Sequence, residues 1–130
     1  MRVLLDTHVW LWMQAEPEKL GPLARALVED VNNELLLSAA SVWEIAIKVR
    51  AGKLRLPEPV SRYVPSRMQS SGVSALAVTH AHAAGVADLP SHHRDPFDRL
   101  LVAQALTEGV PILSSDAQLD AYDSERIAAS

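Results

Sequence analysis

The chain has 130 residues, of which 48% are hydrophobic and 22% charged, and its formal net charge is −4. This length provides one domain, residues 1–130, with a real core, and no run of about eighteen apolar residues occurs, which excludes a membrane-spanning helix. The chain has no cysteine, which excludes disulfides and thiolate metal sites and makes a reducing cytoplasm the expected location.

Short apolar segments alternate with helix-like segments along the sequence. The first half is predicted to contain a strand at 2–5, helices at 9–15 and 21–33, a strand at 34–38 and a helix at 41–52. The second half is predicted to contain helices at about 60–70, 79–89 and 96–109, strands at 72–76 and 111–115, and a short helix from Asp116. Strands separated by helices are typical of a parallel sheet covered on both faces, so we expect a single α/β domain.

Four acidic residues, Asp6, Glu44, Asp98 and Asp116, stand at corresponding places in these elements. Asp6 and Asp116 each end an apolar strand, whereas Glu44 and Asp98 each lie in the first turn of a predicted helix. Taken singly, each acid is explained as a helix-capping residue, and Ser41 with Glu44 matches the capping-box pattern. Taken together, they all belong to the edge where strands end and helices begin, which is where open α/β sheets bind ligands. The sequence therefore predicts that the four carboxylates can meet at this edge.

Asp98 continues the apolar face of the helix at 96–109. Its spacing places it on the same face as three apolar residues, Leu101, Val102 and Ala105. Asp95 precedes Pro96, and a residue before a helix-starting proline occupies the N-cap position. We therefore expect Asp95 to cap the helix and Asp98 to serve the site.

A cluster of carboxylates needs a positive charge or protons to be stable. Carboxylates about 5 Å apart repel each other by roughly 3 kcal/mol per pair at an effective dielectric constant near 20. Helix N-terminal dipoles offset about 0.3–1 kcal/mol each, so protons, a Lys or Arg, or a divalent cation must neutralise the rest. Oxygen ligands without cysteine suit Mg²⁺ or Mn²⁺, and such an ion, partly hydrated, can orient a water and a phosphodiester for hydrolysis.

The basic residues are concentrated in one segment. Six of the twelve Lys and Arg residues lie between Lys48 and Arg67, where only Glu58 opposes them. This segment is either a solvated helical face and loop or a surface that contacts nucleic-acid phosphates on an otherwise acidic protein.

Four segments, taken in order, resemble the PIN-domain ribonucleases, and more closely the VapC-type toxins of bacterial toxin–antitoxin pairs. They are VLLDTHVWLW, LLLSAASVWEIAIKVRAGKL, LPSHHRDPFDRLLVAQA and ILSSDAQL, and the resemblance extends from Met1 to about Tyr122. It implies that the family's acidic constellation falls on Asp6, Glu44, Asp98 and Asp116, with Thr7 as the hydroxyl beside the first acid. Ser114 stands where family members often have Thr. The resemblance further implies Mg²⁺- or Mn²⁺-dependent cleavage of RNA, a homodimer, and inhibition by a cognate VapB-like antitoxin.

Other residues near these segments have less defined roles. His92 and His93 are either structural or solvated loop residues or contacts of RNA phosphates, and His8 is expected to pack or to cap. Arg99 is unassigned, and a supporting role of Asp120 in the site stays open. A core or dimer-contact role is expected for the three tryptophans, Trp10, Trp12 and Trp43, rather than base stacking.

Three functions compete for these residues. The first is a ribonuclease toxin, with Asp6 and Asp98 as principal metal ligands and with Glu44 and Asp116 binding metal directly or through water. The second is another metal-dependent phosphohydrolase or phosphoacceptor domain, which is disfavoured because no second Asp follows Asp6 two residues on and no glycine-rich phosphate loop is present. The third is a non-catalytic subunit whose acidic pocket receives a Lys or Arg from a basic partner segment.

Overall fold

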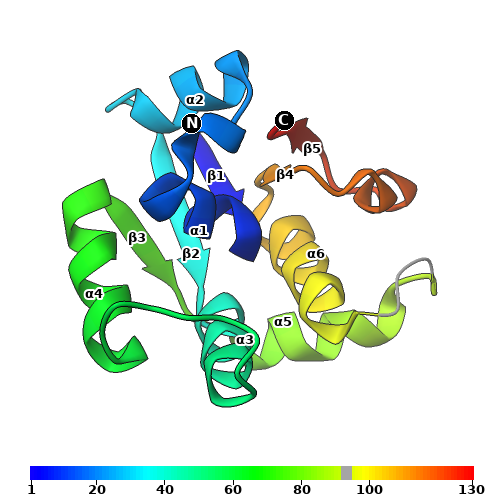
Figure 1. Cartoon of the computed structure of the whole chain (residues 1–130). Coiled ribbons are helices and arrows are strands. Elements are labelled where there is room, and N and C mark those ends of the chain that lie inside the picture. Colours follow the sequence, from blue (N-terminus) through cyan, green and yellow to red (C-terminus); the bar gives the residue numbers. More distant parts are fainter. Residues whose placement is uncertain (92–94) are drawn as a thin grey trace.

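Five parallel strands form the centre of this computed structural model, which describes residues 1–91 and 95–130. Their order across the sheet is β3-β2-β1-β4-β5 (Figure 1). The strands are β1 (Arg2–Leu5), β2 (Glu34–Ser38), β3 (Val73–Leu76), β4 (Ile112–Ser114) and β5 (Arg126–Ala128). The prediction of a parallel α/β sheet is confirmed.

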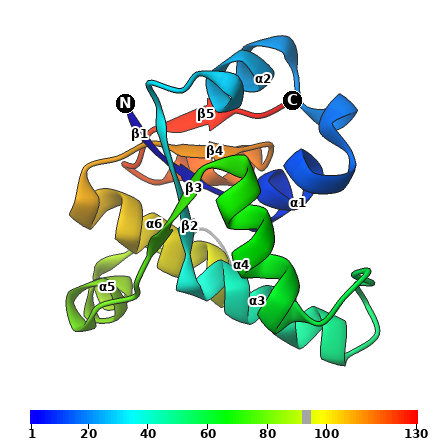
Figure 2. The ribbon, with the colours of Figure 1, turned by 90° about the vertical axis from the view of Figure 1, so that its left-hand side faces the viewer.

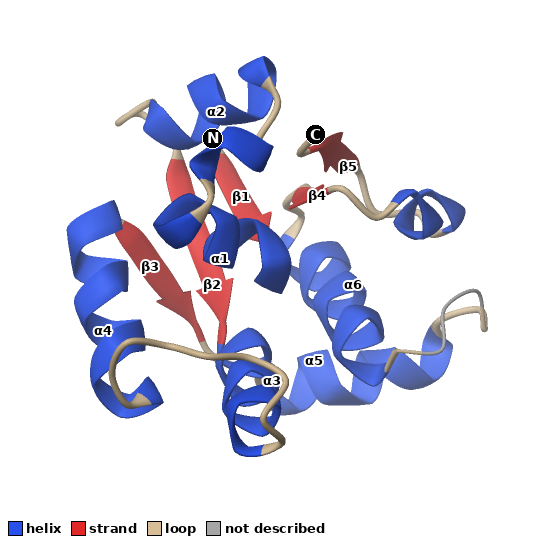
Figure 3. Ribbon diagram, in the orientation of Figure 1, coloured by secondary structure: helices blue, strands red, loops and turns tan. Residues whose placement is uncertain are grey.

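Helices cover both faces of the sheet (Figure 3). They are α1 (Thr7–Ala15), α2 (Pro22–Glu29), α3 (Ala39–Arg50), α4 (Val60–Ser71), α5 (His80–Gly85) and α6 (Pro96–Glu108). Three short 3₁₀ helices join them: η1 (Pro17–Lys19), η2 (Val86–Asp88) and η3 (Ala117–Ala121). No helix in the described part of the chain is both long and apolar enough to cross a membrane.

Alternation along the central strands divides the core into two layers. Val3 and Leu5 of β1 point to the layer that contains α1, α2, α3 and α4, whereas Leu4 points to the layer that contains α6 and η3. The side view shows α5 and α6 on one side of the sheet and α1 and α4 on the other (Figure 2). The central strands are thus buried on both faces, which explains why their sequences are apolar without interruption.

Helix α3 begins two residues earlier than predicted. Its N-cap is Ser38, whose hydroxyl accepts a hydrogen bond of 3.0 Å from the amide of Ala40. Ser41 is buried inside the helix, so the predicted capping box of Ser41 and Glu44 is wrong, and Glu44 lies in the second turn. The helix extends backward because the two alanines at 39–40 favour helical backbone and Ser38 supplies the cap.

Two other predictions from the sequence differ from the structure. Helix α2 ends at Glu29 and not at residue 33, and the spacing of the apolar residues at 23, 27, 28 and 31, which predicts one buried helical face, is misleading at Leu23 and Val31, which are 85% and 95% exposed. Leu27 and Val28 do pack against the core. Strand β5 was not predicted, because its three residues carry little hydrophobic pattern and their pairing with β4 defines the strand.

The register of the strands brings several chain segments to one edge. Asp6 directly follows β1, and its amide donates a 3.0 Å hydrogen bond to the carbonyl of Leu113 in the neighbouring β4. Helix α3 follows β2 without an intervening loop, and Asp116 lies two residues after β4. The carboxyl edge of the sheet therefore presents residues from distant parts of the chain.

Candidate active site

The four predicted acids line one cavity of about 190 Å³ at the carboxyl edge of the sheet. Asp6 comes from the end of β1, Glu44 from α3, Asp98 from the first turn of α6, and Asp116 from the start of η3. The complete lining consists of Asp6, Thr7, His8, Leu11, Glu44, Lys48, Asp95, Asp98 and Asp116. The structure therefore brings together the side chains that the sequence placed at this edge.

Asp6 is the most buried of these acids, with 3% of its surface exposed. One carboxylate oxygen, Oδ1, accepts a 2.7 Å hydrogen bond from the amide of Thr7, and the other, Oδ2, accepts one of 2.6 Å from the hydroxyl of Ser114. Burial raises the pKa of Asp6 above its ordinary value, and the charge of Glu44 adds to the increase. His8 and the two hydrogen bonds lower this pKa in part. A positive charge in the cavity would therefore stabilise the ionised form of Asp6.

Glu44 is paired with Lys48, one helical turn further along α3. The Nζ atom of Lys48 lies 2.8 Å from Oε2 of Glu44, and the side chains are 48% and 9% exposed, respectively. The hydrogen bond with Glu44 raises the pKa of Lys48, and the charges of Asp95 and Asp98 raise it further. Among the described residues, Lys48 is the one Lys or Arg in the cavity wall.

Asp95 caps α6 as predicted. Its Oδ1 atom accepts hydrogen bonds from the amides of Phe97, at 2.8 Å, and Asp98, at 3.4 Å. Asp116 is likewise the N-cap of η3, with Oδ1 accepting a 3.0 Å hydrogen bond from the amide of Gln118. Asp95 and Asp116 therefore each cap a helix and also line the cavity. A capping role does not exclude a role in the site.

Hydroxyl and imidazole groups fix the positions of the first acid and its neighbours. The hydroxyl of Thr7 donates a 2.9 Å hydrogen bond to that of Ser41, which joins α1 to α3. His8 lies with Nδ1 3.5 Å from Oδ2 of Asp6 and Nε2 2.8 Å from the hydroxyl of Ser115. His8 thus packs at the cavity wall and links the ends of β1 and β4.

Sequence reasoning missed Lys48 as a member of the site. The signal was present in the spacing, because a Lys four residues after a Glu on a helix faces it across one turn. His8 was expected only to pack or to cap, and its contact with Asp6 depends on the side-chain rotamer, which the sequence does not specify.

The donor set of the cavity fits a divalent cation. It offers carboxylate oxygens with hydroxyl groups close by, and oxygen atoms are the ligands that Mg²⁺ and Mn²⁺ prefer. In the ranges 1–91 and 95–130, however, no three His, Asp or Glu side chains form a ready-made metal site, and Glu44 is bonded to Lys48. The oxygen ligands therefore favour Mg²⁺ or Mn²⁺. In the structure, however, the ammonium group of Lys48 is bound to Glu44, one of the four acids.

Arg99 and Asp120 are not among the lining residues of this cavity. Arg99 donates hydrogen bonds to the carbonyls of Pro90, at 3.1 Å, and Val86, at 3.2 Å, and so holds the segment before α6. Asp120 forms a two-pronged pair with Arg126, whose guanidinium also donates to the carbonyl of Ser114. His92 and His93 lie outside the described residues.

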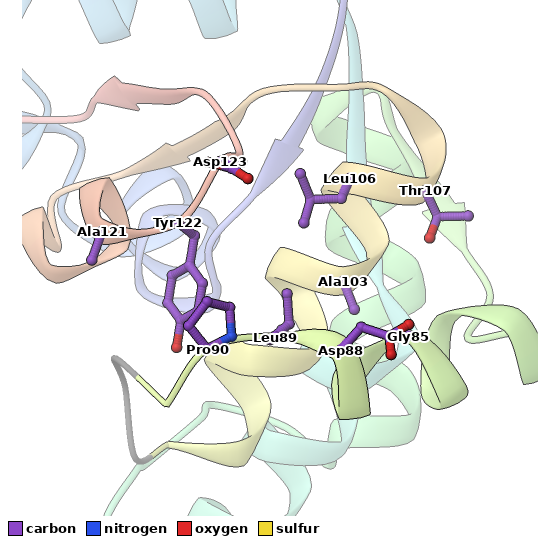
Figure 4. A pocket seen from close by; sticks show the side chains of 10 residues that line it. All are labelled: Gly85, Asp88, Leu89, Pro90, Ala103, Leu106, Thr107, Ala121, Tyr122 and Asp123. Carbon is purple, nitrogen blue, oxygen red and sulfur yellow. The ribbon is translucent and has the colours of Figure 1, made fainter.

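A larger cavity, of about 340 Å³, lies between η2, the C-terminal half of α6 and the segment after η3 (Figure 4). Its two carboxylates, from Asp88 and Asp123, stand on opposite sides, and the ring of Tyr122 lies beside Pro90 (Figure 4). The cavity shares no lining residue with the acidic one. It therefore lacks the clustered carboxylates on which the candidate site depends.

Comparison with known proteins relates the chain to one family. Residues 3–125 match the family described as PIN domain. Ribonuclease VapC22 of Mycobacterium tuberculosis is 32% identical over 121 residues, which cover 92% of this chain and 91% of that protein. Ribonuclease VapC16 of the same organism is 62% identical over 60 residues, and this match spans 46% of the chain and 43% of that relative.

Solved structures show the same fold. The structure of VapBC2 from Rickettsia felis, bound to a DNA fragment from its promoter, superposes with a TM-score of 0.74, covering 100% of both chains at 13% identity. FitAcB from Neisseria gonorrhoeae superposes with a TM-score of 0.62, covering 96% of both chains at 20% identity.

Proposed function

The chain belongs to the PIN domain family, and on this premise we propose that it is a divalent-metal-dependent endoribonuclease that acts as the toxin of a VapBC-type toxin–antitoxin pair. The observation that carries the proposal is the meeting of Asp6, Glu44, Asp98 and Asp116 around one cavity. A relative that aligns over nearly the whole chain is named a ribonuclease, which supports the same activity here.

Asp6 and Asp98 are proposed as the principal ligands of Mg²⁺ or Mn²⁺. Asp6 is suited to this because hydrogen bonds from Thr7 and Ser114 fix the direction of its carboxylate. Glu44 and Asp116 complete the set, directly or through water. When bound, the ion supplies positive charge to the phosphate oxygens and lowers the pKa of a water molecule.

The protein's own groups orient these ligands and balance their charge. The hydrogen bond from Thr7 to Ser41 holds the start of α1 against α3, so that Asp6 and Glu44 face the same space. His8 is held by Ser115 beside Asp6 and limits the positions that this carboxylate can take. Lys48 keeps the Glu44 carboxylate in the cavity wall.

A VapB-like antitoxin is the proposed partner, and a homodimer the proposed assembly. The structures similar to this fold include VapBC-1 from nontypeable Haemophilus influenzae and a toxin–antitoxin complex from Klebsiella pneumoniae. An apolar groove of about 490 Å³ between α3, α4 and the edge strand β3 is suited to a second copy, and Trp43 at its rim is 62% exposed. Because an enzyme must share a compartment with cellular RNA, we place the protein in the cytoplasm.

The activity is tested by measuring cleavage of RNA with Mg²⁺, with Mn²⁺ and with a chelator. We expect cleavage only with metal, and we expect Asp6→Asn and Asp98→Asn to reduce it at least a hundredfold, because each removes a charged ligand. Asp88→Asn is the matched control, since Asp88 lines the other cavity. Cleavage that persists in the chelator, or in Asp6→Asn, would refute the proposal.

A second candidate function is binding of a basic segment without catalysis. The contact between Lys48 and Glu44 favours it, because it places an ammonium group in the acidic cavity. Calorimetry separates the two functions: tight binding of an Arg-rich peptide without any binding of Mg²⁺ or Mn²⁺ supports the second. Binding of the metal by the wild type, lost in Asp98→Asn, supports the first.

A further inference from the structure

A second hollow adjoins the acidic cavity between α3 and the start of α6. This α3–α6 hollow has a volume of about 400 Å³ and shares Glu44, Lys48 and Asp95 with the acidic cavity. Its other lining residues are Ile47, Ala51, Lys53, Pro96 and Phe97. A chain that crosses the carboxylate cluster can therefore continue into this hollow.

Two lysines stand at the hollow, and the backbone fixes their proximity. Helix α3 ends at Arg50, and Gly52, two residues later, is in the left-handed conformation, at a φ of 74°. The amide of Gly52 donates to the carbonyl of Val49, at 3.1 Å, and the amide of Lys53 donates to that of Lys48, at 2.9 Å. This pair of hydrogen bonds is the Schellman motif, which turns the chain back over the last helical turn. Lys53 is thereby placed next to Lys48.

The positive charges matter because the neighbouring cavity repels an anionic substrate. Asp6, Glu44, Asp98 and Asp116 oppose the entry of any phosphate that lacks a cation beside it. The Lys48 side chain is half-exposed although its partner Glu44 is nearly buried, so its ammonium group is accessible from the hollow. The other basic residues of the 48–67 segment line neither space; Arg67, for example, lies over the ring of Tyr63 at 5.2 Å.

Part of the lining of the hollow is apolar, including Ile47 and Phe97. Ile47 is 44% exposed on α3, and the ring of Phe97 packs edge-on against that of Trp43 at a centroid distance of 5.3 Å. Apolar and aromatic surfaces between cations are characteristic of single-stranded nucleic-acid sites, because bases stack there while the cations bind the backbone.

We propose that the α3–α6 hollow binds the nucleotide next to the scissile phosphodiester of the RNA, with its base against Ile47 and Phe97 and its phosphates bound by Lys48 and Lys53. This subsite rests on the proposed ribonuclease function and adds to it the side from which the RNA enters. The acids act on the phosphodiester, and the hollow determines which phosphodiester reaches them.

The test measures binding of an RNA oligonucleotide that the wild type cleaves, in chelator to prevent cleavage, at several salt concentrations. Each phosphate contact in single-stranded RNA contributes about −0.7 to the slope of log K against log salt. Lys48→Gln and Lys53→Gln are each expected to reduce the slope by about 0.7, and the double variant by about 1.4. Lys48→Arg is expected to retain the slope, because it retains the charge.

Lys19→Gln is the matched control, since Lys19 is about as exposed as Lys48 and forms an ion pair with Glu16 away from both spaces. We expect this variant to bind RNA with the wild-type slope. A slope that is unchanged in both Lys48→Gln and Lys53→Gln would overturn the subsite, while failure of the wild type to cleave any RNA would overturn the ribonuclease function itself.

The Ile47→Glu variant tests whether the α3–α6 hollow binds RNA or a second copy of the chain. It adds a negative charge at a half-exposed position, where folding tolerates it. We expect weaker RNA binding and an unchanged oligomeric state in sedimentation. A changed oligomeric state with unchanged RNA binding would assign the hollow to a second copy of the chain and contradict the proposal.

Discussion

Ser114 and Asp6 are joined by a hydrogen bond of 2.6 Å across a sequence separation of 108 residues. The same hydroxyl accepts a 3.0 Å hydrogen bond from the amide of Asp116. One buried serine therefore orients the carboxylate after β1 and the backbone that carries the carboxylate after β4. A Thr at this position would offer the same hydroxyl.

Replacing Ser114 tests this relationship. Ser114→Ala is expected to lower the free energy of unfolding at pH 7 by about 1.5–3 kcal/mol, because a buried hydrogen bond to a charged group is lost. It should also raise the pKa of Asp6 further and reduce RNA cleavage. Ser114→Thr is expected to preserve both properties. Chemical denaturation and cleavage assays of the two variants check the prediction, which is wrong if Ala and Thr behave alike.

The pKa of Asp6 predicts an unusual dependence of stability on pH in the absence of metal. Since the pKa of Asp6 in the folded state is raised above the ordinary aspartate value of 3.8, stability is lost as pH rises from that value through the folded pKa. Asn does not titrate, so in chelator at pH 7 Asp6→Asn is expected to be more stable than the wild type, with the difference vanishing below pH 3.8. Denaturation curves of both proteins at pH 3.5, 5 and 7 measure this difference in the free energy of unfolding.

Asp120→Asn provides a control of opposite sign. Arg126 lowers the pKa of Asp120, so the ionised form contributes stability at neutral pH that is lost as pH falls. The Asp120→Asn variant should therefore be slightly less stable than the wild type at pH 7. If both aspartates shift stability in the same direction, the assignment of the Asp6 effect to burial is contradicted.

Substitutions can test whether Asp95 serves as a helix cap and Asp98 as a residue of the site. Asp95→Ala is expected to destabilise the protein by about 1 kcal/mol, because α6 loses its N-cap. Asp95→Ser retains a capping oxygen and should restore most of the stability and keep RNA cleavage. Asp98→Ser is expected to abolish cleavage with little loss of stability. Equal loss of cleavage in the two Ser variants would assign Asp95 to the reaction as well.

Gly52 connects backbone conformation with the proposed RNA subsite. Gly52→Ala is expected to cost about 1 kcal/mol of stability, because a side chain disfavours its positive φ although the added methyl meets no atom within 4 Å. Displacement of Lys53 should also reduce the salt slope of RNA binding. Gly85→Ala, at a helical φ of −61° and with only an ordinary contact to Ala103, is the control: it should leave the salt slope unchanged and raise stability by about 0.4–1 kcal/mol.

Much of the architecture was predictable because the strands are buried on both faces. The segments at 2–5 and 34–38 coincide with β1 and β2, since runs of apolar residues that end at Asp6 and Ser38 leave little choice of boundary. Strand β5 could not be predicted, because three residues are too few to show a hydrophobic pattern and the segment becomes a strand only when β4 offers it hydrogen bonds.

The acids of the candidate site were easier to predict than the groups that hold them. Carboxylates at strand ends and helix starts are visible in the sequence, and topology carries them to one edge. The contact from Thr7 to Ser41 was hidden, because Ser41 matched the pattern of a helix cap while Ser38 performs that role. The local sequence pattern assigns Ser41 to a helix cap, but in the structure its hydroxyl bonds to Thr7 of another helix.

The central position of β1 determines when the acidic cavity can form during translation. Because β1 pairs with β2 on one side and β4 on the other, the four carboxylates come together only after residue 116 has been made and folded against residue 6. A nascent chain still held by the ribosome at α5 has neither Asp98 nor Asp116. The acidic cavity is therefore incomplete throughout most of the protein's own translation.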